Sequence, residues 1–350
     1  MNKSSLRDIR VIGEKVRHKR PLSAGTSKHR WPVIVIMTQW RFGSTIVGEI
    51  FNQNLDLFYL YEPLWMVDHL RSTGRLPGGT FSTPAREESL KFLSGYARCR
   101  FSPRFVDSIN GWGGRERNGA ICRSSAEDCV MPSAKWTREL CLKFRGRLVT
   151  KLLRVDLDLL KTLVVEDNID LKIIHLVRDP RGSAASRIHY TLAYAQEGDR
   201  DQALNTASRL QSLGLLNFTL KERDSIPGMC KWLRENVQHS YPLPDWLTGR
   251  YYLVRYDDFA DDPVGVTKRL YKFTGLPLPS NVVEWVTRTT ASNNSGSGIF
   301  DVNKDSSATA RKWMSELNKL EIEQVEEECM DMMSILGYKR YDDIIKGDQD

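Results

Sequence analysis

The sequence predicts an α/β fold with a central, mostly parallel sheet flanked by helices. Short apolar runs with many β-branched residues recur along the chain, and helical patterns lie between several of them, which is the order expected of a parallel sheet covered on both faces. The expected strands are 33–37, 57–61, 148–153, 173–177 and 251–254, and the expected helices are 44–54, 156–166, 181–195 and 263–273. No linker-like stretch divides the 350 residues, so we expect one large domain.

The segments that follow the first two strands, and three later stretches, differ in composition. The first ends in the turn "TQWRFGST" (38–45), after which a helix begins near Ser44, and the second ends at Glu62-Pro63. Residues 71–135 are rich in Gly, Ser, Pro and Arg, so we expect a long excursion from the core there, and 289–308 is predicted to be a polar loop. Apolar residues at helical spacing over 313–336 predict a closing amphipathic helix with a solvated glutamate face and Gly337 at its C-cap.

Charge is distributed unevenly. Residues 1–30 carry nine Lys and Arg against Asp8 and Glu14, whereas 315–350 carry four against eleven acidic residues. The total is +7, so the two ends cancel and the body, 31–314, holds +7. We therefore expect a basic, disordered arm at 1–30, a domain at 31–341 and an acidic tail at 342–350. The basic body suits a polyanion such as nucleic acid or a sulfated glycan, and a surface with spare lysines is the plain alternative.

The six cysteines are irregularly spaced and contain no C-x-x-C, which argues against a zinc site. Cys122, Cys129 and Cys141 cluster in a polar stretch, which favours at least one disulfide in an oxidising compartment over buried free thiols. Glycosylation sequons begin at Asn2, Asn217 and Asn293 and also favour a secretory compartment. No window approaches the ~18 apolar residues of a membrane span.

The turn after the first strand has the composition of an anion-binding loop. Gly43 lets the backbone approach a ligand closely, and the amides before the helix, with the hydroxyls of Ser44 and Thr45, favour negative charge. The Walker pattern with its lysine is missing, so Mg-ATP is not the expected occupant. Arg41 can supply a bidentate cation instead. On its own the pattern is also that of any tight strand–helix turn.

Two more strand ends carry polar residues to the edge where open α/β sheets place ligands. The segment "IIHLVRDPRGSAASR" (173–187) predicts Arg178 at a strand end, Asp179 as an N-cap, Pro180 in the first helical turn, and Ser186 about two turns later. The segment "YLYEPLW" (59–65) delivers Glu62 to the same edge, where a carboxylate is placed as a general base. Each pattern alone could be structural.

Taken together, five segments resemble the Golgi carbohydrate 6-O-sulfotransferases, which sulfate galactose, N-acetylglucosamine or N-acetylgalactosamine in keratan sulfate, chondroitin and related glycans. The segments are "QWRFGSTIVGEIFNQNLDLFYLYEPLW", "LKIIHLVRDPRGSAASR", "YYLVRYDDFADDP", "GSGIFDVNKDSSATARKWMSEL" and "CMDMMSILGY". They run from about residue 31 to 341 in the order of that family. The resemblance implies a P-loop-like sulfotransferase fold and the donor 3′-phosphoadenosine-5′-phosphosulfate (PAPS).

The resemblance also implies two donor-binding segments. The first loop would bind the 5′-phosphosulfate through Gln39, Trp40, Arg41, Phe42, Gly43, Ser44 and Thr45. The second would bind the 3′-phosphate through Arg178, Asp179, Pro180, Arg181, Gly182, Ser183, Ala184, Ala185 and Ser186. We assign catalytic roles to Arg41, which would stabilise charge on the donor, and to Glu62, which would act as base towards a glycan or glycosaminoglycan acceptor, with His69 as the next candidate. No metal and no nucleic-acid partner are expected.

Some residues depart from that family. Phe42 stands where a small residue is common, Ser44-Thr45 replaces Ser-Ser, and Met66 replaces a histidine, which puts that histidine's acceptor role in question. The family carries an N-terminal signal anchor and operates in the Golgi lumen. Residues 1–30 contain no apolar stretch of that kind, so either an anchor is missing from this sequence or the protein is anchored differently. A P-loop kinase and a non-catalytic glycan-binding relative remain as alternatives.

Overall fold

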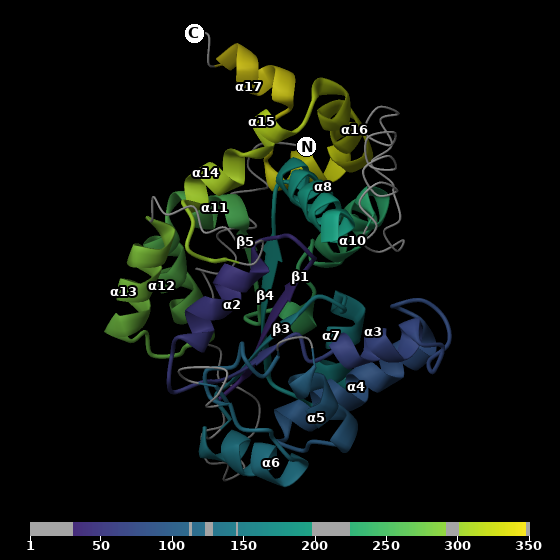
Figure 1. The fold of residues 1–350 in the computed structure, drawn as a ribbon, viewed down its shortest axis with the longest axis vertical. Coiled ribbons are helices and arrows are strands. Elements are labelled where there is room, and N and C mark those ends of the chain that lie inside the picture. The colour runs from purple at the N-terminus through teal and green to yellow at the C-terminus, as the bar shows by residue number, and fades with distance from the viewer. Residues whose placement is uncertain are drawn as a thin grey trace.

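The computed structural model describes residues 31–111, 114–122, 129–144, 146–197, 225–291 and 301–347 (Figure 1). The basic arm at 1–30 and the sequons at Asn217 and Asn293 lie outside these residues. Five strands form one sheet: β1 (Val33–Thr38), β2 (Phe58–Tyr61), β3 (Leu148–Leu152), β4 (Leu171–Val177) and β5 (Tyr251–Arg255). Their order is β2-β3-β1-β4-β5, and all four pairings are parallel, which confirms the predicted sheet.

Helices cover both faces of this sheet because successive side chains of a strand point to opposite faces. In β1, Val33, Val35 and Met37 belong to one buried cluster, and Ile34 and Ile36 belong to another. The first cluster includes α4 (Thr83–Ala97), α5 (Pro103–Asn110), α7 (Leu157–Val165), α10 (Ile226–His239) and α16 (Lys319–Leu336). The second includes α2 (Ser44–Asn52), α11 (Tyr256–Asp261), α12 (Pro263–Thr274) and α13 (Ser280–Thr290).

The remaining helices each contribute at most one residue to these two buried clusters. They are α3 (Trp65–Ser72), α6 (Ala134–Lys143), α8 (Pro180–Glu197), the 3₁₀ turn η3 (Asp245–Leu247), α14 (Ser306–Arg311), α15 (Trp313–Glu316) and α17 (Tyr341–Gly347). Helix α17 covers most of the predicted acidic tail, and its Tyr341 ring packs 6.0 Å from the ring of Trp313. Among the described helices, none is both long and apolar enough to cross a membrane.

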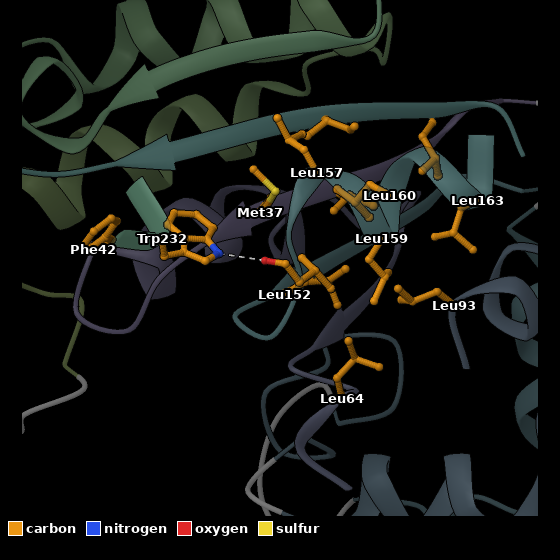
Figure 2. Packing of buried hydrophobic residues seen from close by; sticks show 14 of the residues in the cluster. Met37, Phe42, Leu64, Leu93, Leu152, Leu157, Leu159, Leu160, Leu163 and Trp232 are labelled. Carbon is orange, nitrogen blue, oxygen red and sulfur yellow. Dashed lines mark hydrogen bonds between the residues drawn. The ribbon is translucent and has the colours of Figure 1, made fainter. Parts of the chain in front are cut away.

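The first cluster reaches the loop that follows β1. Figure 2 shows Phe42 and Trp232 at one end of a group of leucines, most of them from α7, with Met37 beside them. The indole nitrogen of Trp232 donates to the backbone oxygen of Val155 at 3.0 Å, and its ring lies 6.4 Å from that of Phe42. The hydrophobic core therefore anchors Phe42, one side chain of the loop that follows β1.

Two predictions about helices were wrong. Residues 71–135 contain α4 and α5, whose Phe92 and Phe105 are buried in the first cluster, so this stretch adds to the core. Proline in the first turn starts both helices, a signal hidden by the overall composition. The closing helix is broken at Leu317, because Asn318 and Glu321 form a capping box that starts α16. Glu321 and Glu326 are buried, so the glutamate face is only partly solvated.

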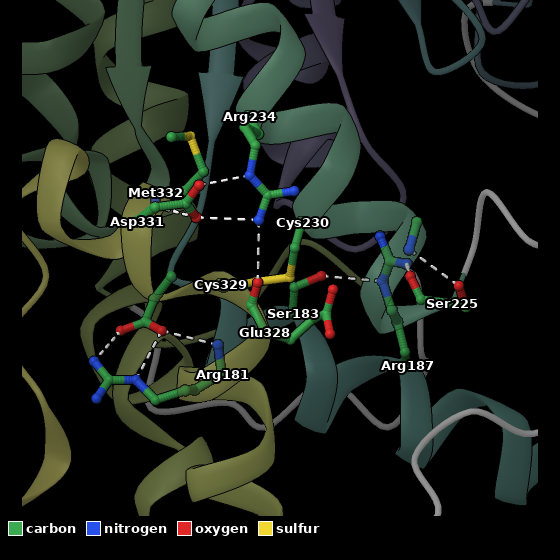
Figure 3. Close-up of a disulfide and its surroundings, with 12 residues drawn as sticks. Arg181, Ser183, Arg187, Ser225, Cys230, Arg234, Glu328, Cys329, Asp331 and Met332 are labelled. Carbon is green, nitrogen blue, oxygen red and sulfur yellow. Dashed lines mark hydrogen bonds and ion pairs between the residues drawn. A yellow bond between two sulfur atoms is a disulfide. The ribbon is translucent and has the colours of Figure 1, made fainter.

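All six cysteines are paired, which confirms the expectation of a disulfide among Cys122, Cys129 and Cys141. The bridges are Cys99–Cys141, Cys122–Cys129 and Cys230–Cys329. The third joins α10 to α16 across 99 residues of sequence, and Figure 3 shows Arg234 of α10 paired with Asp331 of α16 beside it. No cluster of His, Cys, Asp and Glu that could hold a metal ion occurs in the described ranges.

Candidate functional site

The turn between β1 and α2 has the geometry of a candidate anion cradle. Gly43 has φ 78°, and a Cβ at this position would lie 2.1 Å from the ring of Tyr256, so only glycine fits here. Helix α2 begins at Ser44 with no side-chain cap and no acidic residue in its first turn. Its first amides therefore have no intrahelical partner and favour an anion from outside the helix.

A pocket lies over this cradle at the carboxyl ends of the strands. The lining residues are Trp40, Arg41, Gly43, Ser44, Thr45, Ile46, Tyr61, Glu62, Lys151, Leu153, Arg178, Ser186, Tyr256, Asp301, Val302, Lys304, Ser306 and Thr309. Four of them are cationic and two are carboxylates, so the pocket is basic. The pocket brings together strands and loops that are more than 200 residues apart in sequence. Arg41, Glu62, Arg178 and Ser186, which the sequence placed at one edge of the sheet, all line it.

Arg41 connects the two predicted donor-binding segments. Its Nε donates to Ser186 Oγ at 2.8 Å, and its backbone oxygen accepts from Arg178 at 3.1 Å. Burial, and secondly the charge of Arg178, lower the pKa of Arg41 to about 10, so it stays protonated at neutral pH. Two guanidinium groups held this close repel each other, and a polyanion in the pocket would relieve that repulsion.

The segment 178–186 divides between the pocket and the interior. Only Arg178 and Ser186 line the pocket. Asp179 accepts from the backbone and the side chain of Arg181, which confirms its capping role, and Arg181 also pairs with buried Glu326 at 2.7 Å. Burial opposes the charge of Arg181, yet these two carboxylates raise its pKa. Pro180, Gly182, Ala184 and Ala185 lie in the first turns of α8 and outside the pocket lining.

Helix α8 also braces the loop from behind. Arg187 donates to the backbone oxygen of Trp40 at 2.8 Å and to Ser183 Oγ at 3.1 Å. Figure 3 shows Arg187 and Ser183 side by side on this helix, with Ser225 beyond them. Arg187 is buried and is not among the residues that line the pocket, so its contacts hold the loop in place. The sequence pattern contained Arg187 but offered no sign of this role.

Trp40, Phe42 and Gln39 of the predicted loop have three different environments. Trp40 lines the pocket and packs edge-on against Tyr190 at 5.0 Å. Phe42 turns into the core. Gln39 is fully buried, and neither polar atom of its amide has a hydrogen-bond partner among the described residues. An orphaned amide beside an anion cradle is the kind of group that a ligand or water satisfies.

Glu62 lies at the end of β2 in a network of charges. Its φ is 43°, its side chain is 5% exposed, and its oxygens lie 2.8 Å from Lys151 Nζ and 3.1 Å from an Arg154 nitrogen. Burial alone would raise the pKa of this carboxyl, but Lys151 and Arg154 outweigh burial and lower it to about 2. Glu62 is therefore ionised at neutral pH and only weakly basic.

Several lining residues had no role in the sequence-based predictions. Lys151 is the one charged residue of the otherwise uncharged strand β3. A charged residue in a buried strand could have marked it as a candidate site residue. Tyr256, Lys304, Ser306 and Thr309 lie in segments quoted for the resemblance, yet no periodicity marked them. Burial, and secondly the charge of Arg41, lower the pKa of Lys304.

Two residues discussed for the acceptor side lie away from the pocket lining. Met66 packs against the first core cluster, and its backbone amide donates to Ser108. The ring of His69 stacks on Trp65 at 5.1 Å. Neither is among the residues that line the pocket.

Curated proteins are similar to this chain in sequence. Carbohydrate sulfotransferase 2 from Mus musculus and from Homo sapiens is 32% identical over 352 residues, which covers 88% of this chain and 65% of each relative. Carbohydrate sulfotransferase 3 from Homo sapiens is 29% identical, with 91% of this chain and 69% of that relative covered. The chain therefore spans about two thirds of the length of these relatives.

Solved structures with low sequence identity give TM-scores under 0.5. A sulfotransferase domain from the curacin biosynthetic pathway has a TM-score of 0.47 at 16% identity and covers 89% of this chain and 99% of its own. The sulfotransferase domain of the olefin synthase of Synechococcus PCC 7002 has a TM-score of 0.45 at 17% identity and covers 91% and 99%.

The family match extends over nearly all of the described structure. The sulfotransferase domain matches residues 32–337, from the first residues before β1 to the C-cap of α16. This range contains all five strands and every residue that lines the pocket. The chain belongs to the sulfotransferase domain family.

Proposed function

We propose that this protein transfers a sulfuryl group from PAPS to the 6-hydroxyl of a Gal, GalNAc or GlcNAc residue in a glycosaminoglycan or related glycan. One observation carries the donor assignment: Arg41, Lys151, Arg178 and Lys304 meet at the uncapped start of α2 in one pocket. PAPS carries a phosphosulfate and a separate 3′-phosphate, and several cations beside free backbone amides suit both groups.

The residues present fit this donor. Gly43 lets the loop turn tightly beside the Tyr256 ring and lead into the first amides of α2, and Arg41, Ser44 and Thr45 supply further donors. Arg178 and Ser186 would hold the 3′-phosphate. The Arg41–Ser186 hydrogen bond joins the two proposed subsites, so a donor with two anionic ends would be held by both. Lys304, in the segment 301–309 that also lines the pocket, adds positive charge.

The protein's part in the chemistry is positioning and charge stabilisation. Arg41 and the amides of α2 would stabilise the charge that develops on the leaving phosphate when its bond to sulfur breaks. Glu62 would accept the proton of the acceptor hydroxyl. A weak base suffices for this step, because that hydroxyl becomes acidic only as its bond to sulfur forms.

Two features support a glycan acceptor in the Golgi lumen. The relatives are named carbohydrate sulfotransferases, and their similarity covers 87–91% of this chain. Three disulfides in the described residues suit an oxidising compartment. The basic pocket is compatible with an acidic polymer that approaches it.

Sulfate transfer to a panel of acceptors tests the proposal. The protein is incubated with PAPS labelled at sulfur and with chondroitin, keratan or GlcNAc-terminated oligosaccharides, and disaccharide analysis locates the new ester. We expect label at a 6-hydroxyl of at least one acceptor, a large loss in Arg41→Ala, and wild-type transfer in Arg269→Ala, a partly exposed arginine outside the pocket.

Two other outcomes would replace this proposal. A P-loop kinase would be stabilised against heat by Mg-ATP and not by PAPS. A non-catalytic glycan-binding relative would bind chondroitin or heparin but release no adenosine 3′,5′-bisphosphate (PAP) from PAPS.

A further inference from the structure

Asp257 joins two strand ends beside the pocket. Val177, the last residue of β4, is paired with Arg255, the last residue of β5, so the residues that follow these two strands lie next to each other. The backbone amide of Asp179 donates to Asp257 Oδ2 at 3.0 Å. This hydrogen bond ties the turn that carries Arg178 to the start of α11.

The two turns joined in this way each carry a residue that lines the pocket. Arg178 precedes Asp179, Tyr256 precedes Asp257, and both Arg178 and Tyr256 are lining residues. The guanidinium carbon of Arg178 lies 4.8 Å from the centre of the Tyr256 ring. Its Nε is buried and has no hydrogen-bond partner within the described structure. The direction of this guanidinium group therefore depends on how the two turns are held together.

Tyr338 holds Asp257 from the other side. It follows Gly337, the C-cap of α16, and its hydroxyl donates to the same Asp257 oxygen at 2.6 Å. Burial, and secondly the charge of Asp257, raise the pKa of Tyr338 well above its ordinary value, so the hydroxyl keeps its proton. The guanidinium carbon of Arg255 lies 5.0 Å from the centre of the Tyr338 ring, and Arg255 also donates to the backbone oxygen of Leu336. The end of α16 is thereby fastened to the strand end that carries Asp257.

This position is unfavourable for a carboxylate. Burial, and secondly the charge of Asp179, raise the pKa of Asp257. The hydrogen bonds from Tyr338 and from the Asp179 amide, and the charge of Arg178, act in the opposite direction. Two donors that share one oxygen make Asp257 a bridge from α16 to the turn after β4, which explains why a carboxylate is kept here.

We propose that Asp257 and Tyr338 are positioning residues that set the preference for the 3′-phosphate of the donor by holding Arg178 in place. The inference rests on the proposed use of PAPS. Neither side chain is among the residues that line the pocket, so both would act through the turn at 178–179 and not through contact with the ligand. Loss of the bridge would misalign Arg178, whereas the first amides of α2 belong to another segment and would keep their place.

The test compares PAPS with adenosine 5′-phosphosulfate (APS), which lacks the 3′-phosphate. Calorimetric affinities for both ligands are measured for wild type and for Asp257→Ala, which removes the shared oxygen. A lost charge-assisted hydrogen bond predicts a loss of about tenfold in PAPS affinity, with APS affinity within about twofold. Asp257→Asn keeps an oxygen acceptor and should restore most of the preference. The KM for PAPS should rise in Asp257→Ala, while the turnover number at saturating PAPS stays close to wild type.

Tyr338→Phe provides a second arm that removes a single hydroxyl. It should lower the ratio of PAPS affinity to APS affinity in the same direction and by a smaller amount, because the bond from the Asp179 amide remains. Tyr96→Phe is the matched control. The Tyr96 hydroxyl is buried, donates to the backbone oxygens of Phe58 and Val149 at 2.9 Å each, and lies outside the pocket lining. This variant should lower the free energy of unfolding but leave the affinity ratio as in wild type.

The outcomes separate the positioning role from the proposed function. An unchanged affinity ratio in both Asp257→Ala and Tyr338→Phe, or equal losses for both ligands, would overturn the proposal. If thermal melting shows that Asp257→Ala does not fold, Tyr338→Phe decides by itself. A wild type that neither binds PAPS nor transfers sulfate would refute the proposed function. A wild type that transfers sulfate from PAPS, with variants that keep its affinity ratio, would refute only the positioning role.

Discussion

Arg41 and Glu62 share a backbone conformation that few residues with a side chain adopt. Their φ values are 65° and 43°, and each follows the end of a strand. Such a conformation costs on the order of 1–3 kcal/mol and persists only where surrounding contacts hold it. Here those contacts are the Arg178 bond to the backbone of Arg41 and the two cations on Glu62. Strain at two residues that line one pocket is consistent with a functional role for both.

At this scale, Arg41→Ala should impair both PAPS binding and turnover, because it removes a buried cation and the partner of Ser186. Charge-assisted hydrogen bonds of this kind predict at least a tenfold loss of affinity. Arg41→Lys should retain partial activity, because an ammonium group keeps the charge. Affinity from calorimetry and turnover from labelled-sulfate transfer check this. Wild-type affinity in Arg41→Ala would remove Arg41 from the donor site.

Glu62→Gln keeps the shape of the side chain and removes its basicity. General-base catalysis contributes about 10²–10⁴-fold, so the turnover number should fall by that order. Because the pKa of Glu62 is about 2, its ionisation should produce no acid limb in the rate between pH 5 and 8. Turnover above about a tenth of wild type would mean that Glu62 is not the base.

At the scale of elements, the segment that leads into α8 has side chains on two sides, one in the pocket and one in the interior. Arg178 and Ser186 face the pocket, whereas Arg181 binds Asp179 and Glu326 and ties α8 to α16. The disulfide between α10 and α16 reinforces the same wall (Figure 3). The charge of Arg181 is therefore neutralised in the interior, whereas Arg178 lines the pocket.

Arg178→Ala should weaken PAPS by about ten- to a hundredfold, because a charge-assisted bond to the 3′-phosphate is lost. Adenosine 5′-phosphosulfate lacks that phosphate, so its affinity should hardly change. Calorimetry with both ligands decides the point. An equal loss for both would show that Arg178 acts through its bonds to the backbone of Arg41 and Thr309 instead.

Arg181→Leu should destabilise the fold, because it leaves Asp179 and Glu326 as buried carboxylates without this partner. Removing one member of a buried ion pair typically costs about 3–5 kcal/mol. The free energy of unfolding from urea titration measures this. Exposed Arg311→Leu is the control, since a surface pair contributes about 0–1 kcal/mol. A loss under about 1 kcal/mol in Arg181→Leu would contradict this account.

At the scale of the whole molecule, the sheet carries a buried histidine whose charge affects stability. His175 lies in β4 with Nδ1 2.6 Å from the Tyr251 hydroxyl, its other nitrogen lacks a partner in the described structure, and burial lowers its pKa to about 3. The unfolded chain binds this proton near pH 6.5, whereas the folded chain does not. The stability contribution is therefore complete above pH 6.5 and declines as the pH falls towards 3.

The free energy of unfolding should consequently decrease below pH 6.5 by up to ~1.4 kcal/mol per pH unit from this one group. His175→Gln should lose that part of the slope, whereas exposed His239→Gln should keep it. Urea titrations at several pH values between 5 and 7.5 measure both. Identical slopes in wild type and His175→Gln would show that His175 is not the source.

The sequence by itself determined the parallel sheet, the place of the glycine turn before α2 and the capping role of Asp179, because these depend on local patterns. Apolar runs mark buried strands, Gly43 marks a turn that tolerates no side chain, and the carboxyl ends of parallel strands share one edge. The positions of Arg41 and Glu62 beside one pocket follow from that shared edge.

Only the tertiary structure decided which side chains face the pocket. Arg178 and Arg181 stand three residues apart in one motif, yet one lines the pocket and the other lies among buried carboxylates contributed in part by α16. Lys151, Tyr256 and Lys304 enter the site from three separate segments, and no local pattern encodes their meeting. The physical reason is that side-chain charge is stabilised by partners brought close by folding, so its role depends on contacts between residues distant in sequence.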